Sequence, residues 1–420
     1  MFRNNELPNN FNGTIKLNNI NYFFDVENDT LRIFFDERGI SSVREFNKAY
    51  GEILINNVVF GICPDKKRVG FVIGQYNYSA YPDRYSEYKL SLIFKEIYYF
   101  SHKQGDFSIK NFNSFMGIKV SGALIDTIMP QSFITYTQQG QIVFDKKIIE
   151  KENESIFESN KITIKEDVTS IVKTKFKINH NSFAGETLSS IIQFDFDKNY
   201  ELFEMTKIYP VIKNFLDLLV TARNTDYKIK LYQKLNDEEI DFAVVKIFNN
   251  YKNISNKEKY EVVNFEVIQN KIQNIFNNIN NSKYTLCFLP IDNDEYNTIN
   301  YSSIQNLVTA IELACELDRK CPRGASKIDK ANAIYEWCKP YLPIIKDKLH
   351  LAFSLTEDSY FALSGDNILK FRQLRHDITH LASGIIDKNM ANCYIALKSI
   401  LYYYLLDVNV EDKERWKIFY

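Results

Sequence analysis

The spacing of hydrophobic residues divides the chain into a strand-rich first part and a helical last part. Between residues 13 and 144, apolar side chains alternate with polar ones in short runs separated by Asn, Gly and Asp, which predicts an antiparallel β domain. These runs contain Ile15/Leu17, Leu31/Ile33/Phe35, Ile53/Ile55, Val69/Phe71/Ile73 and Ile118/Val120. Residues 146–158 are charged and lack apolar periodicity, so we expect an exposed linker before a second β segment at 162–196.

Helical and strand patterns are mixed in the middle of the chain. Apolar residues at 202–222 recur at helical spacing, and Pro210 within them should end, kink or restart the helix. The patterns that follow predict strands at 227–232 and 242–248, a helix at 267–279 and a strand at 285–289. Residues 249–259 are rich in Asn and Lys and poor in large apolar side chains, which predicts a mobile hinge loop.

From Tyr301 onward the apolar residues follow a helical period. The expected helices are 304–317, 329–338, 346–355, 367–381 and 391–406. Short connections between them favour an antiparallel bundle. The expected fold class is therefore α+β, with a β-rich domain carrying added helices at residues 1–294 and an all-α domain at residues 295–420.

The expected helix at 367–381 carries an unusual set of polar side chains. Its apolar stripe consists of Leu374, Ile378, Leu381 and Ile385. Asp366 is the expected N-cap, and at about 100° per residue His376 and His380 fall roughly opposite the stripe. Arg372 lies beside them and Arg375 lies on the flank. Two imidazoles and two guanidiniums on one polar face therefore make this helix the candidate functional site.

These side chains suit cleavage of a phosphodiester bond. An imidazole with a pKa of about 6.5 can take a proton from a ribose 2′-hydroxyl, and the Arg375 fork can stabilise charge on the phosphorane. That reaction needs no metal. One alternative is a solvated helix face that happens to be basic. Another is a zinc site at His376 and His380, for which the sequence supplies no obvious third ligand nearby.

The spacing of Arg375, His376 and His380 resembles the signature of HEPN ribonucleases, which is an arginine, a polar residue, three further residues and a histidine. The polar residue is often Asn or Asp in that family, and here it is His376. Residues 307–312 resemble the first HEPN helix of ApeA-like antiphage proteins, with a glutamate at Glu312. Further similarity to the ApeA N-terminal domain covers residues 13–17, 51–61, 112–128 and 208–231.

The resemblance implies a metal-independent HEPN endoribonuclease that uses no cofactor and leaves a 2′,3′-cyclic phosphate. It implies that His380 is the general acid or base, that Arg375 stabilises the transition state, and that His376 orients the phosphate or shares the proton transfer. It also implies a homodimer with a composite site, RNA as substrate with transfer RNA as one candidate, and abortive infection triggered by a phage product. The alternative is a catalytically silent HEPN module for dimerisation or nucleotide binding, with recognition by the N-terminal domain.

Other polar residues near the site have two interpretations each. Candidates for RNA contact are Arg372, Lys370, Arg319, Lys320 and Arg323. The last three lie in an expected loop whose positive charge continues to Lys327 and Lys330, and such residues are often simply solvated. Glu312 either supports the site by pairing with an arginine such as Arg375, or is an exposed glutamate.

Composition adds limits to these expectations. The 52 basic and 53 acidic residues nearly cancel, so any RNA contact must be local rather than spread over a basic surface. The six cysteines are scattered without a zinc spacing, which favours free thiols. Because the sequence has neither a secretory signal nor an apolar run of roughly 20 residues, we expect a cytoplasmic protein that does not enter a membrane.

Overall fold

The protein is described from a computed structural model of the full chain. The structure describes residues 10–35, 47–48, 50–53, 58–77, 88–103, 114–122, 124–128, 134–136, 142–144, 155–181, 185–223, 225, 227–247, 263, 265–282, 284–292, 295, 298–321, 324–346, 356–379 and 385–408. The expected hinge loop at 249–259 lies outside these residues.

The chain forms two compact units, each built from separate segments. The first contains residues 1–120, 195–205 and 227–250, and the second contains residues 121–194, 206–226 and 251–420. The boundary expected near residue 295 falls within the second unit, so the division into 1–294 and 295–420 stays a prediction. The architecture is α+β, as the sequence patterns predicted, with a β-rich N-terminal region and helices in the C-terminal part.

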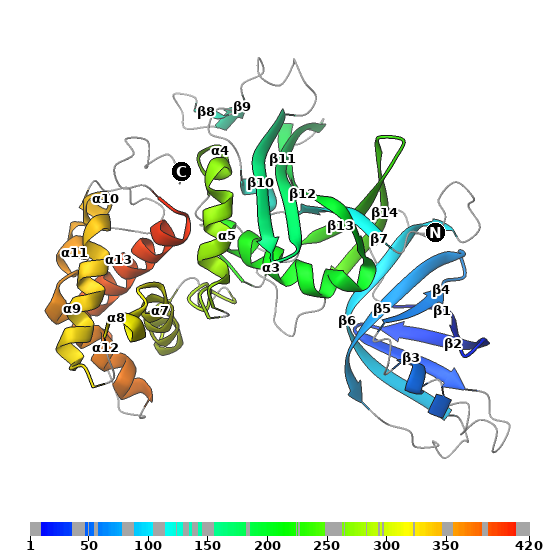
Figure 1. Cartoon of the computed structure of the whole chain (residues 1–420), viewed down its shortest axis with the longest axis horizontal. Helices are drawn as coiled ribbons and strands as arrows, with labels where there is room; N and C mark the ends of the chain where they lie inside the picture. The colour runs from blue at the N-terminus through cyan, green and yellow to red at the C-terminus, as the bar shows by residue number, and fades with distance from the viewer. Residues whose placement is uncertain are drawn as a thin grey trace. The chain divides into compact units, whose positions relative to one another are not determined.

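A sheet that closes on itself forms most of the first unit (Figure 1). Its strands are β1 (Asn10–Leu17), β2 (Ile20–Glu27), β3 (Thr30–Phe35), β4 (Val58–Ile62), β5 (Lys67–Asn77) and β6 (Tyr88–Lys103). The order is β6-β3-β2-β1-β4-β5, and closure follows because β5 also pairs with β6. From β6 the sheet continues through β14 (Glu238–Ile247) and β13 (Lys228–Leu235) to β7 (Ser114–Ser121).

Short turns and a dense aromatic core explain this sheet. The β1–β2 turn holds Asn18 and Asn19 at φ 48° and 66°, left-handed values that asparagine tolerates and that suit two-residue hairpins. Inward side chains such as Phe24 and Phe71 are 0% exposed, and their rings meet edge to face at 5.5 Å. One expected strand is wrong, because Ile53 lies in a helical turn instead; Ile55 lies outside the described residues.

In the second unit, β10 (Ser155–Lys165) pairs antiparallel with β11 (Val168–Asn181), and β12 (Gly185–Glu201) runs from this unit into the first. β10 includes residues 155–158, so the expected linker was wrong there; residues 146–154 are not described. Helix α5 (Ile272–Asn280) lies against β10 (Figure 1), where the Gln273 amide bonds the backbone N–H and C=O of Thr163.

Tertiary packing overrides local sequence signals at two places. Helix α3 (Met205–Leu219) does not end at Pro210, because its buried face, with Ile212 and Phe215 both 0% exposed, holds it in place; the kink that was the other expected outcome at Pro210 stays a prediction. The strand expected at 285–289 is a series of turns, closed by bonds such as Leu289 N–H to Leu286 C=O at 3.1 Å. A short apolar run can be buried without joining a sheet.

The C-terminal part of the second unit is a group of packed helices. They are α7 (Tyr301–Ala314), α8 (Leu317–Lys320), α9 (Lys327–Cys338), α10 (Leu342–Lys346), α11 (Glu357–Phe361), α12 (Gly365–Thr379) and α13 (Lys388–Leu405). The apolar α13 packs against α7, α11 and α12 (Figure 1), and its Leu397, Ile400 and Tyr403 are almost fully buried. Of the helix expected at 346–355, only Lys346 is described, as the last residue of α10.

Candidate functional site between α7, α9 and α12

Helix α12 carries four of the candidate residues, Lys370, Arg372, Arg375 and His376, and a serine begins it. The Ser364 hydroxyl accepts the Asn367 N–H at 3.2 Å, an N-cap arrangement, whereas Asp366 lies inside the first turn. The N-cap expected at Asp366 was therefore wrong by two residues. An acidic residue in the first turn still interacts favourably with the partial positive charge at the helix start.

The buried side of α12 is formed by Ile368, Phe371 and Leu374, which are 1%, 0% and 7% exposed. Leu374 was expected on this face, but the expected stripe was extended too far along the chain. Ile385 lies beyond the helix and is 85% exposed, which corrects that part of the prediction. Of the other two stripe residues, the Ile378 side chain and all of Leu381 are outside the described part.

Glu312 joins two arginines of α12 through three hydrogen bonds. Its Oε1 accepts from Arg372 Nε at 3.1 Å and Nη2 at 2.8 Å, and its Oε2 accepts from Arg375 Nη1 at 2.7 Å. The side chains of Arg372, Glu312 and Arg375 are 15%, 21% and 32% exposed. The pairing considered for Glu312 is thus present, and charge-assisted bonds of this kind hold both guanidiniums in fixed positions.

Helix α7 places Glu312 because its own apolar side is buried. Leu307, Val308 and Ile311 are at most 2% exposed, and α7 packs against both α12 and α13. The N-terminus of α7 is fixed by Asn300, whose side chain accepts the Ser303 N–H at 2.8 Å. With these contacts made, the Glu312 carboxylate lies next to the arginines of α12.

A cleft of about 340 Å³ opens beside this network. Its charged lining residues are Glu312, Lys327, Lys330, Arg372 and Arg375, and His376 also lines it. Four cationic groups and one carboxylate therefore face a single cleft, although the formal net charge of the chain is −1. An anion such as a phosphodiester would be attracted to this place.

Helix α9 supplies the two lysines of the cleft. Ser326 begins α9 with a capping box, in which its hydroxyl accepts the Asp329 N–H and the Asp329 carboxylate accepts the Ser326 N–H, each at 3.1 Å. The positive charge of the expected loop was taken to continue to Lys327 and Lys330; both lie on the first turns of this helix, where only Lys330 was expected. Backbone contact also links the helices, since Arg372 Nη1 reaches the Lys327 carbonyl at 3.5 Å.

The remaining candidates are not brought to the cleft. Lys370 is exposed on α12 and is not among the lining residues. Arg319 and Lys320 belong to α8 rather than to a loop, and Arg319 is 82% exposed in an ion pair with Glu316 at 3.3 Å. His380 and Arg323 were also proposed from the sequence, and both lie outside the described residues.

Sequence reasoning missed Gln373, which also lines the cleft. Its Oε1 accepts from Lys327 Nζ at 2.8 Å, and its Nε2 donates to Asp377 Oδ1 at 2.8 Å. Gln373 therefore links Lys327 of α9 to Asp377, one turn further along α12. Its spacing of three residues from His376 could have indicated this, because residues three apart share a helix face.

Within the described residues, neither the cysteine thiols nor a cluster of metal ligands offers a further reactive group. All six cysteines are free, and burial raises the pKa of the Cys315 and Cys393 thiols to about 12. Within the ranges that the structure describes, no three His, Cys, Asp or Glu side chains gather as metal ligands. No helix in those ranges is both long and apolar enough to cross a membrane.

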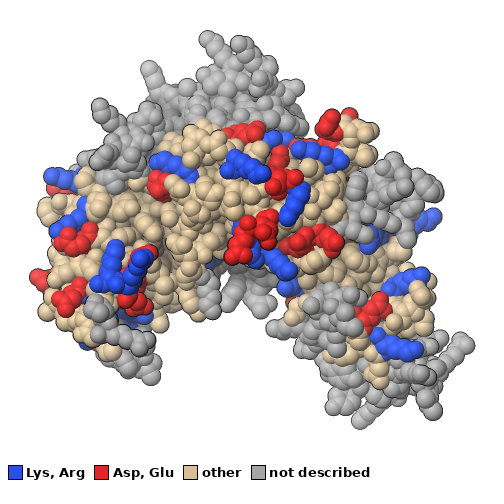
Figure 2. Space-filling model, viewed as in Figure 1, with Lys and Arg blue, Asp and Glu red and all other residues tan. Residues whose placement is uncertain are grey.

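Neither the surface charge nor comparison with known proteins identifies a second candidate site. On the face in Figure 2, basic and acidic side chains are interspersed in short groups over the described residues. Protein-family models, curated proteins and solved structures were compared with the chain, and none matches. The cleft beside α12 is therefore the feature of the described residues that bears on function.

Proposed function

We propose that this chain is an ApeA-like antiphage protein with a C-terminal HEPN domain, a metal-independent endoribonuclease that acts in the cytoplasm during abortive infection. The observation that carries the proposal is the cleft in which Arg375, fixed by Glu312, lies near His376 and the α9 lysines. The signature spacing of Arg375, His376 and His380 supplies the family resemblance. The N-terminal region would sense a phage product and restrain the nuclease.

The proposed reaction is attack of a ribose 2′-hydroxyl on the neighbouring phosphorus. His380 takes the hydroxyl proton, the bond from O2′ to phosphorus forms, and the bond from phosphorus to O5′ breaks. A proton returned to O5′ leaves a 5′-hydroxyl beside a 2′,3′-cyclic phosphate. Arg375 stabilises the extra negative charge of the phosphorane, and His376 orients the phosphate or shares the proton transfer.

The four cationic side chains of the cleft have separate tasks in this proposal. The Arg372 guanidinium makes two bonds to Glu312, so it chiefly positions that carboxylate and through it Arg375. Lys327 and Lys330 bind backbone phosphates on either side of the scissile bond, since phosphate contacts fix the position of a nucleic acid without reading its sequence. RNA, with transfer RNA as one candidate, is the expected substrate.

A second copy of the chain is part of the proposal, because HEPN ribonucleases resemble one another in building a composite site from two signature helices. His376 is exposed on α12, which leaves it accessible to a partner copy. In a two-fold dimer the same surface of each copy meets its equivalent. Cross-linking through a cysteine introduced at Asn367, near the start of α12, would test whether two such helices face each other.

The test of the proposed activity uses purified protein, a labelled RNA and a chelator in the buffer. The wild type should cut the RNA and leave cyclic phosphate ends, whereas His380→Ala and Arg375→Ala should cut about 10² to 10³ times more slowly. Lys346→Ala, at the exposed end of α10, is the matched control and should keep the wild-type rate. A His380→Ala protein as active as the wild type would overturn the mechanism.

The second candidate is a catalytically silent HEPN module for dimerisation or nucleotide binding. It is favoured by one observation, that Glu312 engages both Arg372 and Arg375, as a purely structural ion-pair network would. Induction of the protein in cells separates the two functions. Fragmented transfer or ribosomal RNA supports the nuclease, and intact RNA together with a stable dimer supports the silent module.

A further inference from the structure

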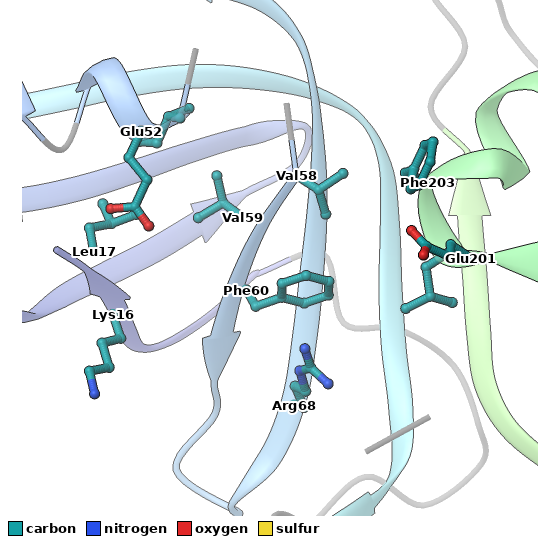
Figure 3. A pocket seen from close by; sticks show the side chains of 11 residues that line it. Lys16, Leu17, Glu52, Val58, Val59, Phe60, Arg68, Glu201 and Phe203 are labelled. Carbon is teal, nitrogen blue, oxygen red and sulfur yellow. The ribbon is translucent and has the colours of Figure 1, made fainter. Parts of the chain in front are cut away.

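A second cavity, of about 420 Å³, lies in the first unit (Figure 3). Strands β1, β4 and β5 line it together with the helical turn at 50–53 and the end of β12. Its charged residues are Lys16, Glu52, Arg68 and Glu201. This volume lies within the range of small-molecule sites, which combine apolar walls with a few fixed polar groups.

Arg68 is held in this cavity by two aromatic rings. Its guanidinium carbon lies 4.2 Å from the Phe60 ring centroid and 5.2 Å from that of Phe100. The register of β4 and β5 pairs Phe60 with Gly70 and Ile62 with Arg68, so Phe60 and Arg68 are diagonal neighbours on one face. In Figure 3 the Arg68 guanidinium lies next to the Phe60 ring.

Gly70 makes this stacking possible. A Cβ built at Gly70 would lie only 2.9 Å from the nearest atom of the Phe60 ring, closer than real Cβ contacts allow. The ring therefore occupies space that any other residue would fill. Burial also lowers the pKa of the Arg68 guanidinium, which marks it as a cation partly removed from water. Phe60 and Arg68 are thus arranged before any ligand arrives.

The two carboxylates of the cavity are anchored by backbone amides. Glu52 Oε2 accepts the Asn18 N–H at 2.7 Å. Glu201 forms a capping box with Glu204, in which each side chain accepts the other residue's backbone N–H, that of Glu201 at 2.9 Å. Both carboxylates are therefore fixed acceptors that can also receive hydrogen bonds from a ligand's hydroxyl or amino groups.

An aromatic side chain at the cavity wall completes the set. Phe203 lies on the 3-10 turn at Leu202–Glu204, lines the cavity and is 45% exposed, although it is large and apolar. Figure 3 shows it beside Glu201. An accessible ring of this kind can stack against the flat face of a nucleobase, a contact that tolerates every base.

We propose that this cavity binds a nucleoside monophosphate. The Arg68 fork binds the phosphate, Phe203 stacks on the base, and Glu52 and Glu201 accept hydrogen bonds from the ribose or the base. A nucleoside monophosphate uses both the Arg68 fork and the Phe203 ring, whereas a bare anion uses only the first and an uncharged nucleoside only the second. The proposal is independent of the nuclease function, because it concerns other residues in the other unit.

Calorimetric titration of the full chain with the four common ribonucleoside monophosphates tests the proposal. The matching nucleosides and inorganic phosphate serve as separate ligands. We expect a monophosphate to bind at least about tenfold more tightly than either, since hydrogen bonds to charged groups and base stacking each contribute. Phe203→Ala and Arg68→Lys should each weaken binding about tenfold. Lys228→Ala, an exposed lysine on β13, should not change it.

Several results would overturn this assignment. One is the absence of binding at millimolar monophosphate, and another is equal affinity for inorganic phosphate or the bare nucleoside. Unchanged affinity in Phe203→Ala is equally decisive, because this exposed side chain can be removed without disturbing the core. The titration is repeated in Arg375→Ala protein, where binding should persist; its loss would move the ligand to the cleft beside α12.

Discussion

The two cavities hold arginine side chains in opposite ways. In the cleft beside α12, Arg372 and Arg375 are fixed by the carboxylate of Glu312, so part of their positive charge is compensated. In the first unit, Arg68 stacks on the rings of Phe60 and Phe100, and the carboxylates of Glu52 and Glu201 line the same cavity. Hydrogen bonds to a carboxylate fix the direction of a guanidinium, whereas stacking on a ring fixes its plane. The cleft beside α12 has four cationic side chains and one carboxylate, whereas the first cavity has two of each.

The largest expected effect is a loss of RNA cleavage that differs between Arg375 and Arg372, the two arginines that bind Glu312. Arg375→Ala should reduce RNA cleavage about 10² to 10³ fold, the loss that follows removal of one transition-state donor. Its stability should change little, because Glu312 keeps both bonds from Arg372. Arg372→Ala should instead lower the melting temperature more and the cleavage rate less. Equal rates in the two variants, measured beside their thermal melts, would remove the distinction between the two roles.

Buried thiols allow the two units to be compared by pH and alkylation. Burial raises the pKa of Cys63 in the first unit and of Cys315 and Cys393 in the second to about 12, from an ordinary value of 9.0. Between these pH values the unfolded chain binds fewer protons than the folded one, so stability falls as pH rises through that window. The half-buried Cys287 should react first, and the others about a hundredfold more slowly if opening costs about 2.7 kcal/mol.

Mass spectrometry of the alkylated protein identifies which thiol reacts at each time. Cys63 reports on the opening of the first unit, and Cys315 and Cys393 report on the second. If the units open independently, the rate for Cys63 should respond to Gly70→Ala while the rates for the other two do not. A single common rate for all three would show that the units unfold together.

The aromatic support of Arg68 is broken most directly at Gly70. Gly70→Ala should destabilise the protein by about 1–3 kcal/mol, the usual cost of overpacking, because its Cβ would meet the Phe60 ring at 2.9 Å. Gly51→Ala is the control, since a Cβ there has nothing within 4 Å. Denaturant unfolding measures both. A Gly70→Ala protein as stable as the control would mean that Phe60 moves aside freely and does not fix Arg68.

The sequence predicted helix α12 within about two residues at each end, and at about 100° per residue it predicted that His376 would face away from the core. Such local features follow from periodicity. The exposure of Ile385 could not be predicted in this way, because the spacing of apolar residues does not show where a helix ends. The joining of Glu312 to Arg375, 63 positions apart, depends on how α7 packs against α12.

The first cavity lay beyond sequence reasoning for a related reason. Phe60, Arg68 and Gly70 become neighbours only through the register of β4 and β5, and Phe203 reaches the same place from the end of β12. Alternation of apolar residues predicts strands but does not set which residue faces which across a pair. Among the turn residues, Asn18 and Asn19 did carry a local signal, because their types favour the left-handed conformation found there.

The smallest expected effect tests whether the cleft lysines bind RNA through charge alone. Lys327→Ala and Lys330→Ala should each weaken RNA binding a few fold and reduce the slope of log affinity against log salt by about one. The Lys346→Ala control should leave the slope unchanged, since that lysine does not line the cleft. Binding is measured by anisotropy in His380→Ala protein, so that the RNA stays intact. Lys327 should contribute less than Lys330, because its ammonium group already donates to Gln373 and must leave that bond to reach a phosphate. Should both variants keep the full salt slope, the substrate path would not run along α9.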